Sequence, residues 1–200
     1  MARLKTNSSK SAAMAERTFS LREKKDWLKH TGSVLVGSLF VTRTPQIKLP
    51  RSSTLANAFT IGFTKSNAEN FFKRLQSAGV KKVVDVRLHN TSQLSGFAKA
   101  DDLKYLLKSV GNIDCVHEPL LAPTDEMLKA YKKQKGSWEQ YEKQFLGLME
   151  TRVIEKNFSP QNFESACLLC SEAKPHHCHR RLICEYLNEK WNGALSVKHL

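Results

Sequence analysis

The chain has 200 residues, 40% hydrophobic and 26% charged, a composition typical of a globular protein and not of a fibrous or intrinsically disordered one. The formal net charge is +13. Residues 1–60 hold 11 Lys and Arg against 3 acids (+8), and the remaining 140 hold 21 against 16 (+5). Because most of the excess charge lies in the N-terminal part, it does not predict that the fold itself binds nucleic acid.

The cysteines point to a reducing compartment. There are five, four of them within 18 residues: Cys115, Cys167, Cys170, Cys178 and Cys184. An odd, crowded set is not typical of the disulfide framework of a secreted domain, so we expect free thiols and a cytoplasmic protein. No apolar stretch approaches the roughly 20 residues that span a bilayer, and we therefore expect no membrane partner.

Residues 1–57 are polar and basic, and we expect a partly disordered N-terminal extension. Organelle transit peptides are also rich in Arg and Ser and poor in acids, so targeting to an organelle is the alternative interpretation.

From Ala58 onward, strand and helix patterns alternate. The predicted strands are Ala58–Phe63, Val83–Val86, Ile113–His117, Ala166–Cys170 and an edge strand Leu195–Val197. The predicted helices are Asn67–Ala78, Asp101–Val110, Asp125–Gln134, Trp138–Lys156 and Cys178–Trp191. Ser66, with Glu69 three residues later, forms a capping-box pattern at the first helix. The alternation predicts one α/β domain over residues 58–200, with three layers: a mostly parallel sheet and helices on both faces.

Chemically active residues follow the predicted strands. Ligands of open parallel sheets bind beyond the carboxyl ends of the strands. The first four strands deliver Lys65, then Asp85 and Arg87, then His117, then Cys170 and Glu172 to that edge. A carboxylate, a guanidinium, an imidazole and a thiol on one edge predict a functional site.

Asp85 has two interpretations. It stands among Val83, Val84 and Val86, where an unpaired charge would be costly. It is either a general base or ligand-orienting carboxylate, or the buried ion-pair partner of Arg87.

The segment Cys170–Arg181 is the richest in functional groups. Cys178 is predicted at a helix N-terminus beside His and Arg residues, which together lower a thiol's pKa and favour a nucleophile. The same helix end, with Arg180 and Arg181, suits a phosphate. If this segment has no catalytic or binding role, it is a polar turn in which Cys170 packs as a small apolar residue. Cys115, Cys167 and Cys184 are interpreted in that way.

Zinc is a further hypothesis for this segment. Cys170 and Cys178, with any two of His176, His177 and His179, provide the ligand types that zinc prefers. The seven-residue gap between the two cysteines matches no common zinc knuckle.

Three aromatic residues, Tyr131, Trp138 and Tyr141, lie in the helical region before the fourth strand. Burial for packing is their commoner use. Stacking on a planar substrate is the alternative.

Three segments, Ile61–Asn67, Val83–Arg87 and Leu168–Arg180, resemble the domain-of-unknown-function 488 family in order and spacing. The resemblance extends from about Phe59 to Trp191. It implies a compact α/β fold and a site built from the residues that match the family's motifs, and it implies no activity. Those residues are Asp85, Arg87, Cys170, Glu172, Cys178, His179 and Arg180. The chain departs from the family's pattern at Phe63, where a His is usual, and at Leu120–Ala122, where a Gly pair is expected.

A weaker likeness to rhodanese and phosphatase domains fails at their substrate loop, in which Arg follows Cys after five residues. Here His176 stands at that distance from Cys170, and Cys184 at that distance from Cys178.

The leading hypothesis is an enzyme that acts on a phosphate-bearing substrate, a nucleotide or nucleic acid. Its expected catalytic residues are Asp85, Glu172, Cys178 and His179, and its expected substrate-binding residues are Lys65, Arg87, Arg180 and Arg181. One alternative is a nucleic-acid-associated binding module that uses the basic extension. The other is a structural zinc domain without catalysis, with Cys170, Cys178 and His179 as ligands.

Overall fold

The computed structural model describes residues 55–91 and 95–200. The predicted basic extension and its alternative as a transit peptide fall outside these residues, apart from Leu55, Ala56 and Asn57. Within the described part, no helix is both long and apolar enough to cross a membrane.

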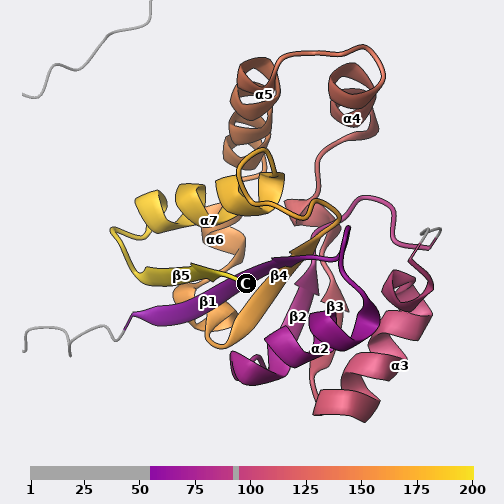
Figure 1. Cartoon of the computed structure of the whole chain (residues 1–200). Coiled ribbons are helices and arrows are strands. Elements are labelled where there is room, and N and C mark those ends of the chain that lie inside the picture. The colour runs from indigo at the N-terminus through magenta and orange to yellow at the C-terminus, as the bar shows by residue number, and fades with distance from the viewer. Residues whose placement is uncertain (1–54, 92–94) are drawn as a thin grey trace, which may run out of the picture. The chain divides into compact units, whose positions relative to one another are not determined.

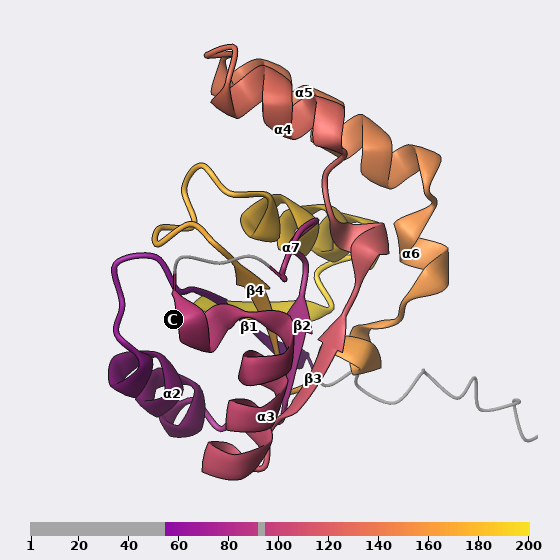
Figure 2. The same ribbon diagram turned by 90° about the vertical axis from the view of Figure 1, so that its right-hand side faces the viewer.

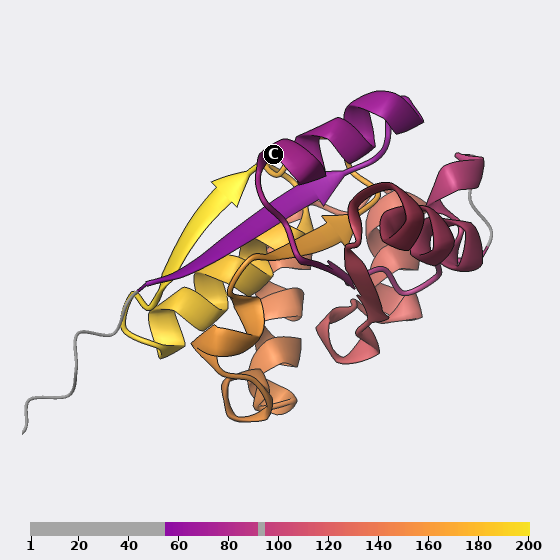
Figure 3. The same ribbon diagram turned by 90° about the horizontal axis from the view of Figure 1, so that it is seen from below.

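The domain is built on a sheet of five parallel strands in the order β3-β2-β4-β1-β5. They are β1 (Ala56–Gly62), β2 (Lys82–Asp85), β3 (Asp114–His117), β4 (Ala166–Cys170) and β5 (Leu195–His199). Figure 3 shows β5, β1 and β4 side by side. The fourth strand in the chain therefore lies at the centre of the sheet.

Helices cover both faces of the sheet, which confirms the predicted three-layer α/β fold (Figures 1 and 2). One face carries α2 (Ala68–Ser77) and α3 (Ala100–Gly111). The other carries α7 (His179–Lys190), with α5 (Trp138–Thr151) and α6 (Ile154–Asn157) packed against it. The helix α4 (Asp125–Lys132) precedes α5. Short 3-10 helices form at Gly96–Ala98, Pro119–Leu121 and Pro160–Phe163.

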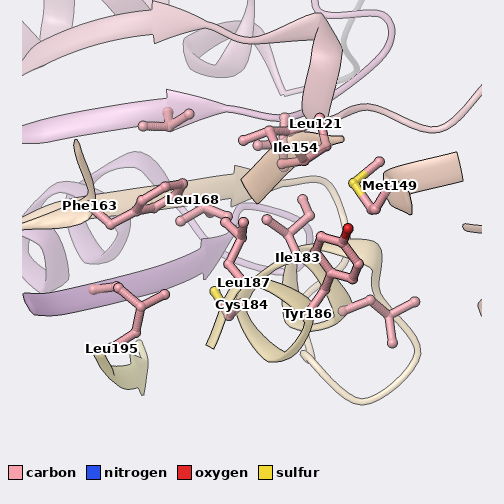
Figure 4. Packing of buried hydrophobic residues seen from close by; sticks show 14 of the residues in the cluster. Leu121, Met149, Ile154, Phe163, Leu168, Ile183, Cys184, Tyr186, Leu187 and Leu195 are labelled. Carbon is pink, nitrogen blue, oxygen red and sulfur yellow. The ribbon is translucent and has the colours of Figure 1, made fainter. Parts of the chain in front are cut away.

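The central strand is buried on both sides, so its sequence is continuously apolar. Ala166 and Leu168 pack into the cluster beneath α7, and Cys167 and Leu169 pack into the cluster beneath α2 and α3. Figure 4 shows Ile183 and Leu187 of α7 close to Leu168. Each such Leu or Ile contributes about 1.5–3 kcal/mol of burial free energy relative to an exposed side chain.

The start of α2 differs from the predicted capping box. Asn67, not Ser66, is the N-cap, and its Oδ1 accepts a hydrogen bond from the Asn70 backbone N–H at 2.8 Å. Ser66 instead donates to the Asn67 carbonyl. Asn and Ser are equally good N-cap residues, so the sequence pattern alone did not separate them.

The predicted single helix Trp138–Lys156 is wrong: α5 ends at Thr151 and α6 begins at Ile154. Between them Val153 has a left-handed backbone (φ 50°), which is rare for a β-branched residue. The Arg152 guanidinium donates to the Leu120 and Ala122 carbonyls at 2.6 and 2.7 Å. The turn after it places Ile154 in the core, fully buried.

Candidate functional site

The site is assembled where β4 ends and α7 begins. Cys170 is the last residue of β4, Cys178 is the N-cap of α7, and His179 is the first residue of that helix. The intervening loop returns the chain over the carboxyl end of the sheet. All three side chains are buried. The predicted location of the site, beyond the carboxyl ends of parallel strands, is therefore where Cys170, Cys178 and His179 lie.

Arg180 anchors the loop between β4 and α7 through hydrogen bonds. Its guanidinium donates to the Glu172 carbonyl at 2.6 Å and to the Ala173 carbonyl at 3.3 Å, and its Nε to the Thr60 hydroxyl at 3.3 Å. Arg180 is fully buried, so these partners compensate the loss of hydration of its charge. Arg180 thus ties the loop to β1 instead of projecting toward a ligand.

The loop also lies directly on Gly62, the last residue of β1. A Cβ atom at this position would overlap the carbonyl oxygen of Glu172. The Thr64 backbone N–H and hydroxyl both donate to the Ser171 carbonyl, the former at 3.1 Å. The close approach of the two backbones explains why glycine stands at this position.

Cys170 and His179 form a buried pair. The Nδ1 atom of His179 lies 3.6 Å from Cys170 Sγ, and its Nε2 lies 2.9 Å from the carbonyl oxygen of Val86. A carbonyl oxygen only accepts, so Nε2 carries a proton. Nδ1 is then free to exchange a proton with the thiol.

The surroundings of Cys170 favour its thiolate. Its pKa lies well below the ordinary 9.0, because the Cys178 thiol donates a hydrogen bond and because His179 and the Glu172 backbone stabilise the anion against the effect of burial. Hydrogen bonding to Cys170, together with burial, raises the pKa of Cys178. Burial alone lowers the pKa of His179, but the Cys170 thiolate and the Val86 carbonyl raise it above its ordinary value. The directions of these shifts favour Cys170 over Cys178 as the thiolate of the pair.

The same three side chains have the geometry of a metal site. One ligand atom from each of Cys170, Cys178 and His179 lies within 4.8 Å of the other two. The hydrogen bond from His179 Nε2 to the Val86 carbonyl is the outer contact that usually orients a metal-binding histidine.

Cys170, Cys178 and His179 line a pocket of about 110 Å³. One part of its wall is aromatic: Trp138 stacks on Tyr141 at 5.3 Å and on His177 at 5.0 Å between ring centroids, and Tyr131 lies 4.9 Å from Tyr141. At its rim Lys132 donates to Glu172 at 2.9 Å. A cavity of roughly 150 Å³ holds benzene, so this pocket admits a group of only a few heavy atoms.

The predicted ion pair between Asp85 and Arg87 is present. Arg87 donates from Nε and Nη2 to the two carboxylate oxygens at 2.7 and 2.6 Å, and Asn90 donates to the same carboxylate at 3.1 Å. A further Arg87 nitrogen donates to the Ala98 carbonyl. Both side chains are buried. Arg87 lines the pocket, and Asp85 does not.

The other predicted substrate-binding residues lie elsewhere. Lys65 lines a separate, larger cleft. Arg181 pairs with Glu185 at 2.9 Å and with Glu142 at 3.4 Å. The structure therefore brings Arg87, Cys170, Glu172, Cys178 and His179 together, and it separates Lys65 and Arg181 from them.

Sequence reasoning missed Lys132 and the carbonyl of Val86. The choice of Cys178 as the nucleophilic thiol stays a prediction, and the directions of the pKa shifts favour Cys170 instead. Lys132 belongs to a helix far along the chain from the loop it contacts, and a backbone carbonyl carries no sequence signature. Of the aromatic residues, Tyr141 is buried in the core and its ring also forms part of the pocket wall. Stacking on a planar substrate stays a prediction.

A family model described as domain of unknown function DUF488 matches residues 67–187, more than half of the chain. The chain belongs to the DUF488 family. The match contains every residue of the Cys-His pair and of the pocket, and it ends within α7. Comparisons with curated proteins and with solved structures gave no match.

Proposed function

We propose that this DUF488 protein is an enzyme that uses Cys170 as a nucleophile toward an electrophilic carbon of a phosphate-bearing substrate. The observation that carries the proposal is the pairing of Cys170 Sγ with His179 Nδ1 at 3.6 Å at the floor of a pocket. A nucleophile beside a base whose other nitrogen is fixed by a third group is the usual arrangement for covalent catalysis.

The proposed reaction is hydrolysis of an acyl group in two steps. The Cys170 thiolate attacks the acyl carbon and forms a carbon–sulfur bond, and the leaving group departs with the bonding electrons and the proton from His179 Nδ1. Water then attacks the thioester carbon and gives a proton to Nδ1. The carbon–sulfur bond breaks, and the thiolate and imidazolium are restored.

Cys178 and Glu172, two of the predicted catalytic residues, take supporting roles in this proposal. The Cys178 thiol donates to the Cys170 thiolate, as the causes of their opposite pKa shifts indicate. Glu172 holds Lys132 at the rim of the pocket. Asp85 keeps Arg87 in place through two hydrogen bonds.

The experiment is labelling with iodoacetamide and with p-nitrophenyl acetate, followed by peptide mass spectrometry. Cys170 should be modified first by both reagents, and the acetyl group should be lost again in water. Cys115 is the internal control, since it is more exposed than Cys170 but burial and the nearby Asp85 raise its pKa to about 11. If Cys115 reacts faster than Cys170, the thiolate proposal is wrong.

A zinc centre is the second candidate, supported by the ligand cluster itself. Two thiolates and one imidazole with a fourth position open to a pocket are typical of catalytic zinc, and a closed fourth position is typical of structural zinc. The metal content of natively purified protein, measured by plasma mass spectrometry, tests it. Stoichiometric zinc that is lost in Cys178→Ser and kept in Cys184→Ser supports the zinc centre, and metal-free wild type contradicts it.

The nucleic-acid-binding role of the basic extension stays a prediction, because almost all of residues 1–57 lie outside the described part of the chain.

A further inference from the structure

A second cleft lies on the other side of the loop from Cys170. It has a volume of about 710 Å³, within the usual range of ligand sites. Its basic side chains come from three elements: Lys65 from the turn after β1, Lys73 and Arg74 from α2, and Lys198 from β5. Among the described residues, no Asp or Glu side chain lines it.

The positive charge of this cleft is largely uncompensated. Lys73 pairs with Glu69 on the same helix at 2.5 Å. Within the described part of the chain, Lys65, Arg74 and Lys198 form no ion pair, although the surface elsewhere has several. Like charges gathered in one concave surface attract anions.

Neutral donors surround these cations. Ser66, Asn70 and Ser77 also line the cleft. Hydroxyl and amide groups beside Lys and Arg are the usual ligands of phosphate oxygens. The chemistry of the lining thus fits a phosphate ester.

One loop separates the cleft from the pocket of Cys170. Ala173 lines the cleft, and its neighbour Glu172 lines the pocket. Arg180 holds the carbonyls of both residues, and Gly62 lies beneath them. Residues 172 and 173 therefore belong to the boundary between the two cavities, and hydrogen bonds from Arg180 hold this boundary in place.

We propose that this cleft, formed around Lys65, Arg74 and Lys198, binds phosphate groups of the substrate while the reacting group enters the pocket of Cys170. The entry of the reacting group into the pocket of Cys170 rests on the proposed function. The binding of phosphate groups rests on the cleft alone. The phosphate belongs either to a small nucleotide or to a nucleic-acid strand.

The test compares two triple variants of the full chain with the same change of charge. Lys65→Gln/Arg74→Gln/Lys198→Gln alters the cleft. Lys133→Gln/Lys143→Gln/Lys156→Gln alters exposed lysines outside both cavities. The control is needed because residues 1–60 alone carry +8, a charge expected to attract polyanions nonspecifically. Thermal melting establishes that both variants fold.

Binding of a fluorescent single-stranded oligonucleotide and of a fluorescent 5′-mononucleotide is measured over a range of salt concentrations. The cleft variant should bind at least one of them roughly ten-fold more weakly than the control and with a shallower salt dependence. Loss of mononucleotide binding identifies a nucleotide site, and loss of oligonucleotide binding alone identifies a strand site. Equal affinities of the two variants for both probes overturn the proposal.

Cys170→Ser separates this inference from the proposed function. The serine variant should keep wild-type affinity for the probes, and the cleft variant should keep the wild-type rate of Cys170 alkylation. If Cys170 is not alkylated first while the cleft variant binds the probes more weakly than the control, only the thiolate proposal is wrong. If Cys170 is alkylated first but the two triple variants bind the probes equally, only the phosphate site is wrong.

Discussion

Arg87 donates to both carboxylate oxygens of Asp85, at 2.7 and 2.6 Å, inside the domain. Removal of one partner leaves the other charge buried without compensation, which costs about 3–5 kcal/mol. Asp85→Asn should therefore lower the free energy of unfolding by roughly that amount, as measured by urea denaturation.

The matched control for that variant is Asp114→Asn, which breaks the ion pair with Lys108 on the surface. Its expected cost is less than about 1 kcal/mol. If the two variants are equally stable, the buried pair does not stabilise the fold, and a role for Asp85 in proton transfer regains support.

Gly62→Ala should displace the loop that carries the site, because the added methyl group overlaps the Glu172 carbonyl. We expect a loss of roughly 1–3 kcal/mol, the usual cost of overpacking, together with slower alkylation of Cys170. Gly147→Ala is the control, since nothing lies within 4 Å of its Cβ position and alanine favours helix α5. Unchanged alkylation in Gly62→Ala would show that the loop tolerates the shift.

Alkylation of Cys170 should depend on pH with a midpoint well below 9.0, because the thiolate is the reactive form and its pKa is lowered. The rate is full above that pKa and falls as the pH drops through it. Cys178→Ala removes the thiol donor and should move the midpoint upward, whereas Cys178→Ser keeps an O–H donor and should move it less. A midpoint near 9 in the wild type contradicts the proposed ion pair.

Arg180→Lys and Arg181→Lys should differ although the residues are neighbours. A lysine cannot reach the Glu172 and Ala173 carbonyls and the Thr60 hydroxyl together, so we expect Arg180→Lys to cost about 1–3 kcal/mol through unsatisfied buried groups. Arg181 is partly exposed, and its ion pairs with Glu185 and Glu142 tolerate lysine at less than about 1 kcal/mol. The melting temperatures of the two variants, measured by thermal unfolding, test this difference in stability. Equal melting temperatures would mean that Arg180 does not hold the loop.

The sequence predicted the sheet well because buried strands leave a strong pattern. The bounds of β4 were predicted correctly, since Ala166–Cys170 is an uninterrupted apolar run before a polar loop. The rule that ligands bind beyond the carboxyl ends of strands then located the site without any motif.

The details of the site could not be predicted, because they depend on backbone atoms and on the path of one loop. Arg180 was itself expected to bind phosphate, yet its guanidinium donates to two carbonyls, to the Thr60 hydroxyl on β1 and to Cys178 Sγ. The position of these hydrogen-bond partners depends on how the loop turns over Gly62, which no residue spacing in the sequence indicates. The break before Ile154 was missed for a similar reason, because it requires a left-handed valine that propensity disfavours.

The strand order has a consequence for synthesis. The strand β1 pairs with β4 on one edge and with β5 on the other. About 100 residues separate the end of β1 from the start of β4. At translation rates of roughly 5–20 residues per second, β1 therefore waits several seconds with both edges unpaired. Chaperones that shield exposed strands are expected to bind the nascent chain in that interval. Since Cys170 ends β4, and Cys178 and His179 follow it in the chain, the surroundings that lower the pKa of Cys170 form only after β4 and the start of α7 have been synthesised.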